Sequence, residues 1–321
     1  MDASRRFEDS AAIAEGSVTR AAAMVFVRVI ALLVPALLGG TDARLAMGVD
    51  ARPAMAAEAP TPAGSPAAAA RIVSLAPSVT ETLFALGVGD RVVAVSDYCD
   101  YPPEATRLPR VGSFNSPSVE AVIAQRPDLV IGLPSPGNHE NVLTMRRLGV
   151  RVEIVDPQRL ADVPVVTRRI AEVAGVPAAG DRLVAQITRE MDAVKARVAG
   201  VPKPRALMLV GQDPLIAVGP ESFLGEMLEA AGAVNVAPAG ESWPRLNLEV
   251  AIAENPDVII DCSMGTEAGT ATLAFWTRFA SLAAVKNGRV HPFRSFEALR
   301  PGPRLAQALE ELARLLHPDR F

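Results

Sequence analysis

The sequence is poor in the residue types that build most metal and catalytic sites. It holds two cysteines and three histidines in 321 residues, and aromatic residues make up only 4% of it. Cys99 and Cys262 lie far apart and have no zinc or iron–sulfur spacing, so we expect two unpaired thiols. His139, His291 and His317 stand alone. The sequence predicts neither a metal centre nor a cofactor of its own.

Catalytic and phosphate-binding motifs are also missing. There is no G-x-S-x-G elbow, no H-E-x-x-H pair and no G-x-x-x-x-G-K-[ST] loop, and Gly87-Val88-Gly89 lacks the third glycine of a dinucleotide fingerprint. With 32 basic and 36 acidic residues the net charge is −4, and no basic run could track phosphates. An enzyme is not predicted, and nucleic acid is excluded as a partner.

One long apolar stretch, residues 21–40, lies near the N-terminus, and an Ala/Pro-rich segment follows it. This pattern indicates a signal peptide region over residues 1–56, with Ala54-Met55-Ala56 as a cleavage motif, and a linker over 57–70. The alternative is an uncleaved anchor, although the uninterrupted apolar run is shorter than the ~20 residues of a spanning helix. No cysteine lies nearby for a lipid anchor. We expect a periplasmic protein.

A fifteen-residue phrase occurs twice. Residues 118–132 (SVEAVIAQRPDLVIG) return as residues 247–261 (NLEVAIAENPDVIID). Each copy predicts a helix capped by Ser118 or Asn247, with an acidic residue in its first turn, that runs into Pro-Asp and a β-strand. The repeat predicts two similar lobes. The identical pairs include Glu120/Glu249, Ile123/Ile252, Ala124/Ala253, Pro127/Pro256 and Asp128/Asp257.

Strand and helix patterns alternate through the rest of the chain, which is typical of mostly parallel sheets with helices on both faces. Examples are the strand 71–75, a helix that starts at Ser78 with Glu81 in a capping box, a second strand over 91–95 and a helix near 272–284. Residues 181–198 have apolar residues at helical spacing without Gly or Pro. The sequence therefore predicts an α/β protein with an N-terminal lobe (71–177), one long connecting helix (178–200) and a C-terminal lobe (201–321).

The few aromatic residues lie at informative places. Tyr98 and Tyr101 follow the second predicted strand, Phe114 precedes the first repeat and Trp243 precedes the second. Loops at the carboxyl edges of parallel strands are where α/β proteins bind ligands. Two facing lobes would place these side chains on both walls of one cleft, although Tyr101 and Phe114 could equally be ordinary core residues.

Six segments, counting the two repeats, together resemble the periplasmic binding proteins of ABC importers for cobalamin, ferric siderophores and haem, and the resemblance covers the chain from Arg71 onward. The family has two lobes joined by one long helix, and the sequence is most similar to its cobalamin-binding member. Besides the repeats, the segments are RIVSLAPSVTETLFALG (71–87), SDYCDYPPEA (96–105), ESWPRLN (241–247) and RPGPR (300–304).

The resemblance implies a monomeric carrier that traps cobalamin or a related corrinoid between its lobes and delivers it to an ABC permease dimer. Glu120 and Glu249 match the family's paired glutamates that dock onto permease arginines. Two positions depart from the cobalamin pattern, because Ile216 replaces an aromatic residue and Phe296 an acidic one. The implied ligand-binding residues are Tyr98, Phe114, Trp243 and Arg300.

These departures leave other cargoes open. Tyr101 matches the iron-ligating tyrosine of related haem carriers. A ferric siderophore would need cationic groups, for which Arg245, Arg294 and Arg300 are candidates. An enzyme on the related scaffold, such as a chelatase, would have to use His291 and Glu297, which have simpler explanations as strand-end and loop residues.

Overall fold

The computed structural model describes residues 69–263, 273–293 and 300–321. The chain divides into two compact units, Met1–Pro60 and Thr61–Phe321, and every described residue belongs to the second. The predicted signal peptide region 1–56 and most of the linker 57–70 therefore lie outside the described residues. So do Arg294, Phe296 and Glu297.

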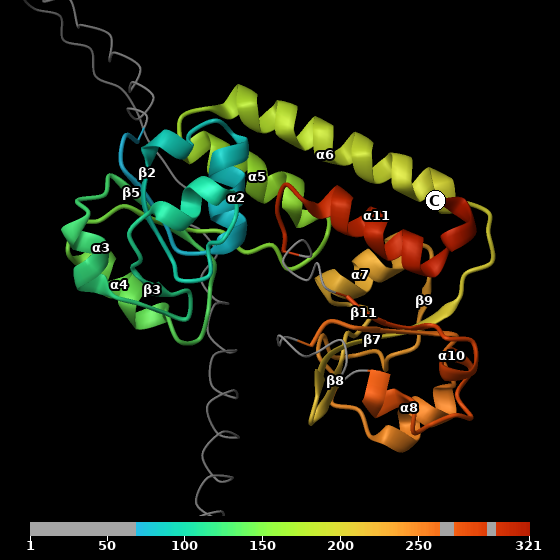
Figure 1. Cartoon of the computed structure of the whole chain (residues 1–321). Coiled ribbons are helices and arrows are strands. Elements are labelled where there is room, and N and C mark those ends of the chain that lie inside the picture. The colour runs from blue at the N-terminus through green and yellow to red at the C-terminus, as the bar shows by residue number, and fades with distance from the viewer. Residues whose placement is uncertain (1–68, 264–272, 294–299) are drawn as a thin grey trace, which may run out of the picture. The chain divides into compact units, whose positions relative to one another are not determined.

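The N-terminal lobe is built on a parallel sheet of four strands in the order β2-β1-β5-β6 (Figure 1). Strands and helices alternate along it, as the sequence predicts. In chain order its elements are β1 (Ile72–Ser74), α2 (Pro77–Ala85), the 3₁₀ helix η1 (Gly89–Arg91), β2 (Val92–Val95), η2 (Pro103–Arg107), β3 (Gly112–Ser113), β4 (Ser116–Pro117), α3 (Val119–Ala124), β5 (Leu129–Gly132), α4 (His139–Arg147), β6 (Val152–Ile154) and α5 (Asp162–Val173).

The C-terminal lobe is built on a five-stranded sheet with β11-β10-β7-β8 in order and β9 beside β7. Only the β7–β8 pairing is antiparallel among the described strands of this sheet, so the prediction of a mostly parallel sheet is confirmed. Its elements are β7 (Arg205–Gln212), β8 (Leu215–Ala217), α7 (Phe223–Ala230), β9 (Val234–Asn235), α8 (Leu248–Glu254), β10 (Val258–Asp261), α10 (Ala283–Lys286), β11 (Val290–Pro292), α11 (Leu305–Leu316) and the 3₁₀ helix η4 (Pro318–Arg320).

One long helix, α6 (Pro177–Val198), joins the lobes, as predicted (Figure 1). Its 22 residues span about 33 Å at 1.5 Å per residue. It packs on α5 of the N-terminal lobe and on α11 of the C-terminal lobe. Its inner face is a stripe of buried apolar side chains with helical spacing: Leu183, Val184, Ile187, Met191, Val194 and Val198.

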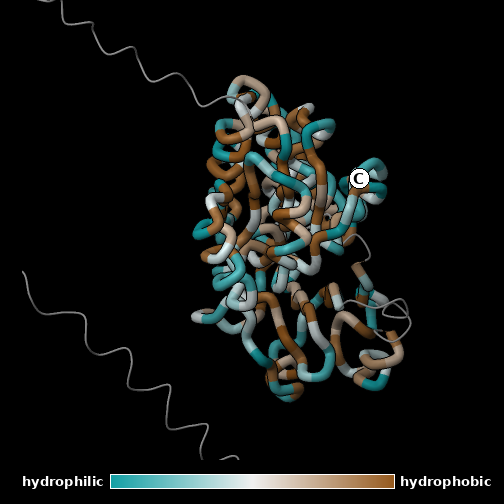
Figure 2. The backbone as a smooth tube through the Cα atoms, turned by 90° about the vertical axis from the view of Figure 1, so that its left-hand side faces the viewer, coloured by the Kyte–Doolittle hydropathy of each residue, from teal (hydrophilic) through white to brown (hydrophobic). Residues whose placement is uncertain are grey.

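The lobes share one hydrophobic core along α6. Neighbouring strand residues face opposite sides of a sheet, so Ile72 packs into this shared core and Val73 into a separate core beneath α3 and α4. In the other lobe Ile260 joins the shared core, whereas Ile259 faces the core beneath α8. Figure 2 shows hydrophobic stretches along the interior segments and hydrophilic residues at the turns.

One predicted element is wrong. The sequence pattern favours a single helix over residues 272–284, but a turn interrupts it after residues 273–276, and the described chain is helical again only in α10. The apolar spacing that suggested one helix instead serves tertiary packing, because Trp276 is fully buried and contacts Phe275 and Phe279 edge-on.

The two repeated phrases form the same local structure. The side chain of Ser118 accepts a hydrogen bond from the backbone of Ala121 at the start of α3, and the side chain of Asn247 accepts one from Glu249 at the start of α8. The predicted caps are confirmed. After each helix one residue with positive φ, Arg126 at 48° or Asn255 at 42°, turns the chain toward the following strand.

Candidate functional site

Phe114 lies on the loop between β3 and β4, and the buried side-chain amide of Asn138 holds this loop in place. Asn138 is 3% exposed, and its Nδ2 donates hydrogen bonds to the carbonyl oxygens of Phe114 and Leu133, both at 3.0 Å. Ser135 Oγ also donates to Asn115 Oδ1 at 2.6 Å. Phe114 therefore lies on a fixed loop, and its side chain is half-buried.

Trp243 lies on a segment that runs antiparallel along β8. Backbone hydrogen bonds join Ala217 N to Pro244 O (2.9 Å) and Gly219 N to Ser242 O (3.0 Å). The predicted departure Ile216 bridges to Arg245 in the same ladder. Because Pro244 is buried while Trp243 is 50% exposed, this pairing presents the indole outward.

Residues of both lobes line one cavity of about 460 Å³. It brings together three of the four residues for which the sequence predicts ligand binding. Tyr98 is not among its lining residues and is 61% exposed. The lining consists of Phe114, Pro157, Gln158, Ser222, Phe223, Leu224, Ser242, Trp243, Arg300 and Pro301.

A buried charge pair connects the lobes beside this cavity. Glu81 accepts two hydrogen bonds from Arg304, at 2.8 Å from Nε and 2.7 Å from Nη2. These hydrogen bonds raise the pKa of Arg304 above its ordinary value, more than burial lowers it. The guanidinium also lies 4.2 Å from the ring centroid of Tyr101, a cation–π contact.

This pair corrects the predicted capping box. Helix α2 begins at Pro77 with Ala76 as its N-cap, and no side chain caps it. Glu81 does not turn back to the helix end, because it reaches Arg304 in the other lobe. Residues 78–83 are all buried, and a carboxylate in such a helix needs a cationic partner.

The two predicted docking glutamates lie in equivalent places. Glu120 and Glu249 occupy the first turns of α3 and α8, and both are exposed. Ser118 Oγ donates to Glu120 Oε2 at 3.2 Å. The first turn is the positive end of a helix, where an acidic residue is favourable.

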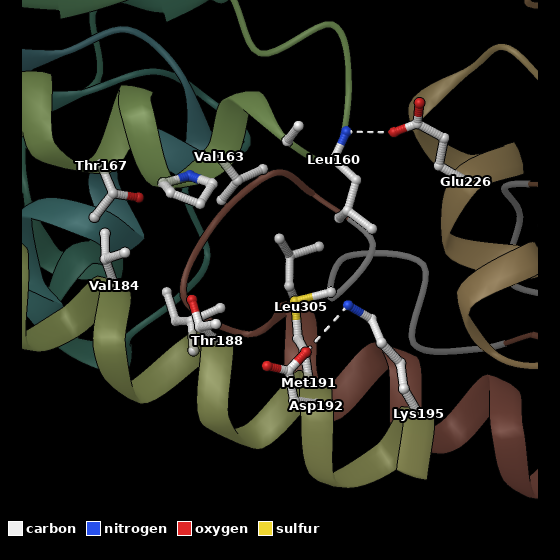
Figure 3. Close-up of a pocket in the computed structure, with 13 residues that line it drawn as sticks. Leu160, Val163, Thr167, Val184, Thr188, Met191, Asp192, Lys195, Glu226 and Leu305 are labelled. Atoms are coloured by element: carbon white, nitrogen blue, oxygen red, sulfur yellow. Dashed lines mark hydrogen bonds and ion pairs between the residues drawn. The ribbon is translucent and has the colours of Figure 1, made fainter. Parts of the chain in front are cut away.

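A second cavity, of about 390 Å³, lies against α6 (Figure 3). Its wall is mostly apolar and includes Val163, Met191 and Leu305 from three helices. At its edge Glu226 of α7 accepts a hydrogen bond from the backbone of Leu160 at 2.7 Å. Among the described residues no aromatic side chain lines this cavity, which distinguishes it from the cavity lined by Phe114 and Trp243.

The described residues contain no group of three side chains that could hold a metal ion. His317 is buried against the carbonyl of Gly232, and His291 lies on β11 with its pKa lowered by burial and by Arg289. Both cysteines are unpaired, as predicted, and both are buried. Burial raises the pKa of the Cys262 thiol, which disfavours a thiolate nucleophile.

In the described part of the chain no helix is long and apolar enough to span a membrane.

The two lobes, the single connecting helix and the cavity lined by residues of both lobes define a binding protein of the bilobed class. The family model described as periplasmic binding protein matches residues 72–294. The chain belongs to this family, as the sequence resemblance predicts. Its relatives are binding proteins that carry cargo and are not enzymes.

Three relatives illustrate the range within the family. The uncharacterized ABC transporter substrate-binding lipoprotein YvrC of Bacillus subtilis is 32% identical, over 78% of this chain and 81% of its own length. The crystal structure of the periplasmic vitamin B12 binding protein BtuF of Vibrio cholerae matches with a TM-score of 0.69 and 27% identity, over 78% of this chain and 98% of that one. The periplasmic haem-binding protein RhuT of Roseiflexus sp. RS-1 matches with a TM-score of 0.71 and 31% identity, over 78% and 99%.

Proposed function

We propose that this protein is exported to the periplasm, captures cobalamin or a related corrinoid between its lobes, and delivers it as a monomer to an ABC transporter permease dimer. The observation that carries the proposal is the convergence of Phe114, Trp243 and Arg300 on one cavity. Aromatic faces suit the flat apolar rim of a corrin, and an arginine suits the oxygen atoms of its amide side chains. Tyr98 is exposed and does not line this cavity, and the proposal includes it among the ligand-binding residues on the family resemblance alone.

The proposal is tested by equilibrium binding of cyanocobalamin, cobinamide and haemin to one preparation of the purified protein. We expect retention of the corrinoids, and an affinity for cyanocobalamin that falls by about tenfold or more in Trp243→Ala, as for the truncation of an aromatic anchor. Leu148→Ala, an exposed apolar truncation next to α4, serves as the control. Unchanged binding in Trp243→Ala would place the ligand elsewhere.

Haem is the second candidate, because Tyr101 is 43% exposed and a haem-binding protein is among the solved structures that match. A tyrosine phenolate is a known haem ligand. The two cargoes are distinguished by the haemin Soret band. A haemin complex whose Soret shift is lost in Tyr101→Phe, together with no retention of cyanocobalamin, would replace the corrinoid by haem.

The proposed contact with the permease rests on Glu120 and Glu249. An exposed carboxylate in a first helical turn can accept a bidentate hydrogen bond from arginine. We expect Glu120→Arg and Glu249→Arg to keep the affinity for cyanocobalamin and to reduce permease-stimulated ATP hydrolysis, with the double variant more impaired. The control is Glu229→Arg, since Glu229 is exposed on α7. Weakened ligand binding in the two variants would assign them to the ligand site instead.

A further inference from the structure

Four charged side chains from the two lobes meet at one side of the cavity. Glu81 and Asp100 come from the N-terminal lobe, and Arg300 and Arg304 from the segment that precedes α11. The Glu81 side chain is 3% exposed, those of Arg304 and Arg300 are 19% and 22% exposed, and that of Asp100 is 56% exposed. We call these four residues the charge cluster.

Within the charge cluster, Arg304 has a structural role, because it pairs with Glu81. Its two hydrogen bonds to Glu81 and its contact with the ring of Tyr101 occupy the guanidinium on an edge and on a face. A carboxylate as buried as Glu81 requires this partner, because an unpaired buried charge costs several kcal/mol. The guanidinium of Arg304 is therefore not available to bind a ligand.

Arg300 is different, because it lines the cavity. Its Nη1 lies 3.0 Å from Asp100 Oδ1 and 3.6 Å from Glu81 Oε1. Two guanidinium groups and two carboxylates leave the charge cluster without net charge, so the positive charge that a ligand would meet at Arg300 is already balanced. No other residue that lines this cavity in the described chain is charged.

We propose that Asp100 and Glu81 determine specificity by charge: they neutralise the cleft arginine Arg300, so that the cleft favours a large ligand without net negative charge and discriminates against carboxylate-bearing ligands. An anionic group that approaches Arg300 must displace Asp100 or lie beside it, and like charges in one site disfavour binding. A neutral ligand can accept hydrogen bonds from Arg300 without displacing its counter-charges. This inference rests on the proposed function, since it assumes that cargo occupies the cleft.

The exposed Asp100 allows a test that leaves the buried pair intact. Cyanocobalamin has no net charge, whereas haemin carries two propionates, so their affinities for the wild type and for Asp100→Asn are compared by titration. We expect haemin affinity to rise about tenfold in the variant, equivalent to about 1.4 kcal/mol. Cyanocobalamin affinity should change less than about twofold. Haemin binding to the variant should weaken with added salt.

Glu104→Gln is the matched control, because Glu104 is exposed on η2 of the same lobe and the substitution removes the same charge. An equal gain of haemin affinity in this control would show an effect of net charge and overturn the inference. A parallel change for both ligands in Asp100→Asn, or no gain for haemin, would overturn it as well.

Binding of cyanocobalamin and haemin to the wild-type protein distinguishes failure of this inference from failure of the proposed function. If it binds cyanocobalamin and Asp100→Asn behaves like the wild type toward haemin, only the charge inference fails. If it retains haemin but not cyanocobalamin, both fail, because the cleft then prefers the anionic ligand. If it binds neither probe, the proposed function fails and the inference fails with it.

Discussion

Asp128 and Asp257 occupy the same position in the two repeated phrases and anchor the first strand of each lobe. Asp128 Oδ2 accepts hydrogen bonds from the backbone nitrogens of Ala70 (3.0 Å) and Arg71 (2.9 Å), and Asp257 Oδ2 accepts one from Arg205 (2.9 Å). The same arginine side chains donate back to the carbonyl oxygens that end α3 and α8. In both lobes, the repeated helix–strand unit is thus bonded to the neighbouring strand by the same aspartate and arginine contacts.

Removal of these carboxylates should destabilise the protein. Hydrogen bonds to a charged group contribute about 1.5–3 kcal/mol, and exposure places these near the lower end. We expect Asp128→Ala and Asp257→Ala each to lower the free energy of unfolding by about 1–2 kcal/mol, measured by urea denaturation. Asp90→Ala is the control, because Asp90 is exposed on η1. Equal stabilities of Asp128→Ala and Asp90→Ala would refute this account of the repeat.

His291 predicts a pH dependence of stability. Burial first, and the charge of Arg289 second, lower its pKa in the folded state, so the neutral imidazole is favoured there. Its stabilising contribution is present above the unfolded-state pKa of about 6.5 and is lost as the pH falls through the lower folded value. Urea denaturation at pH 7.5 and 5.0 should show a larger loss for the wild type than for His291→Gln. Identical losses would exclude His291 as the titrating group.

The packing of α5 on α6 depends on a glycine inside a helix. A Cβ on Gly180 would lie 2.5 Å from the Cβ of Ala171, closer than two carbon atoms can approach. The absent side chain therefore allows α6 to lie directly on the N-terminal lobe. Glycine has a low helix propensity, so its presence inside α6 is explained by this close packing.

A larger side chain at this position should force the two helices apart. We expect Gly180→Val to lower the free energy of unfolding by about 1–3 kcal/mol, the usual range for overpacking. Ala185→Val makes a matched control, because Ala185 is exposed on the same helix, and should cost less than about 0.7 kcal/mol. Differential scanning calorimetry of the pair checks this, and similar melting temperatures would count against the close approach.

For the lobes as a whole, three features oppose a wide closing motion. Helix α6 is continuous across both lobes, its buried stripe belongs to a core that they share, and Glu81 with Arg304 joins them by a buried ion pair. Hinge-bending binding proteins instead close by rotation about a few loop residues. The radius of gyration from small-angle X-ray scattering should therefore agree within error with and without cyanocobalamin, and a reproducible compaction would contradict this.

The sequence alone determined the features that depend on neighbouring residues. Periodicity and capping predicted α6, the repeated unit and most strands of both sheets, because hydrophobic spacing and helix-end chemistry act over a few residues. The two-residue strand β9 was not predicted. The interrupted helix near Trp276 shows the limit, since its apolar residues follow tertiary packing and not one helical face. Composition and missing motifs predicted neither a nucleic-acid partner nor an enzyme.

Only the tertiary structure decided which distant residues meet. Glu81 and Arg304 are 223 positions apart, and no local pattern distinguishes an acid that caps its helix from one that pairs across a cleft. The sequence assigned Phe114, Trp243 and Arg300 to one predicted cleft, but only the structure shows that Asp100 balances Arg300 and that Tyr98 does not line the cavity. Ligand contacts and charge pairing depend on how the lobes pack together, and a one-dimensional pattern does not contain that information.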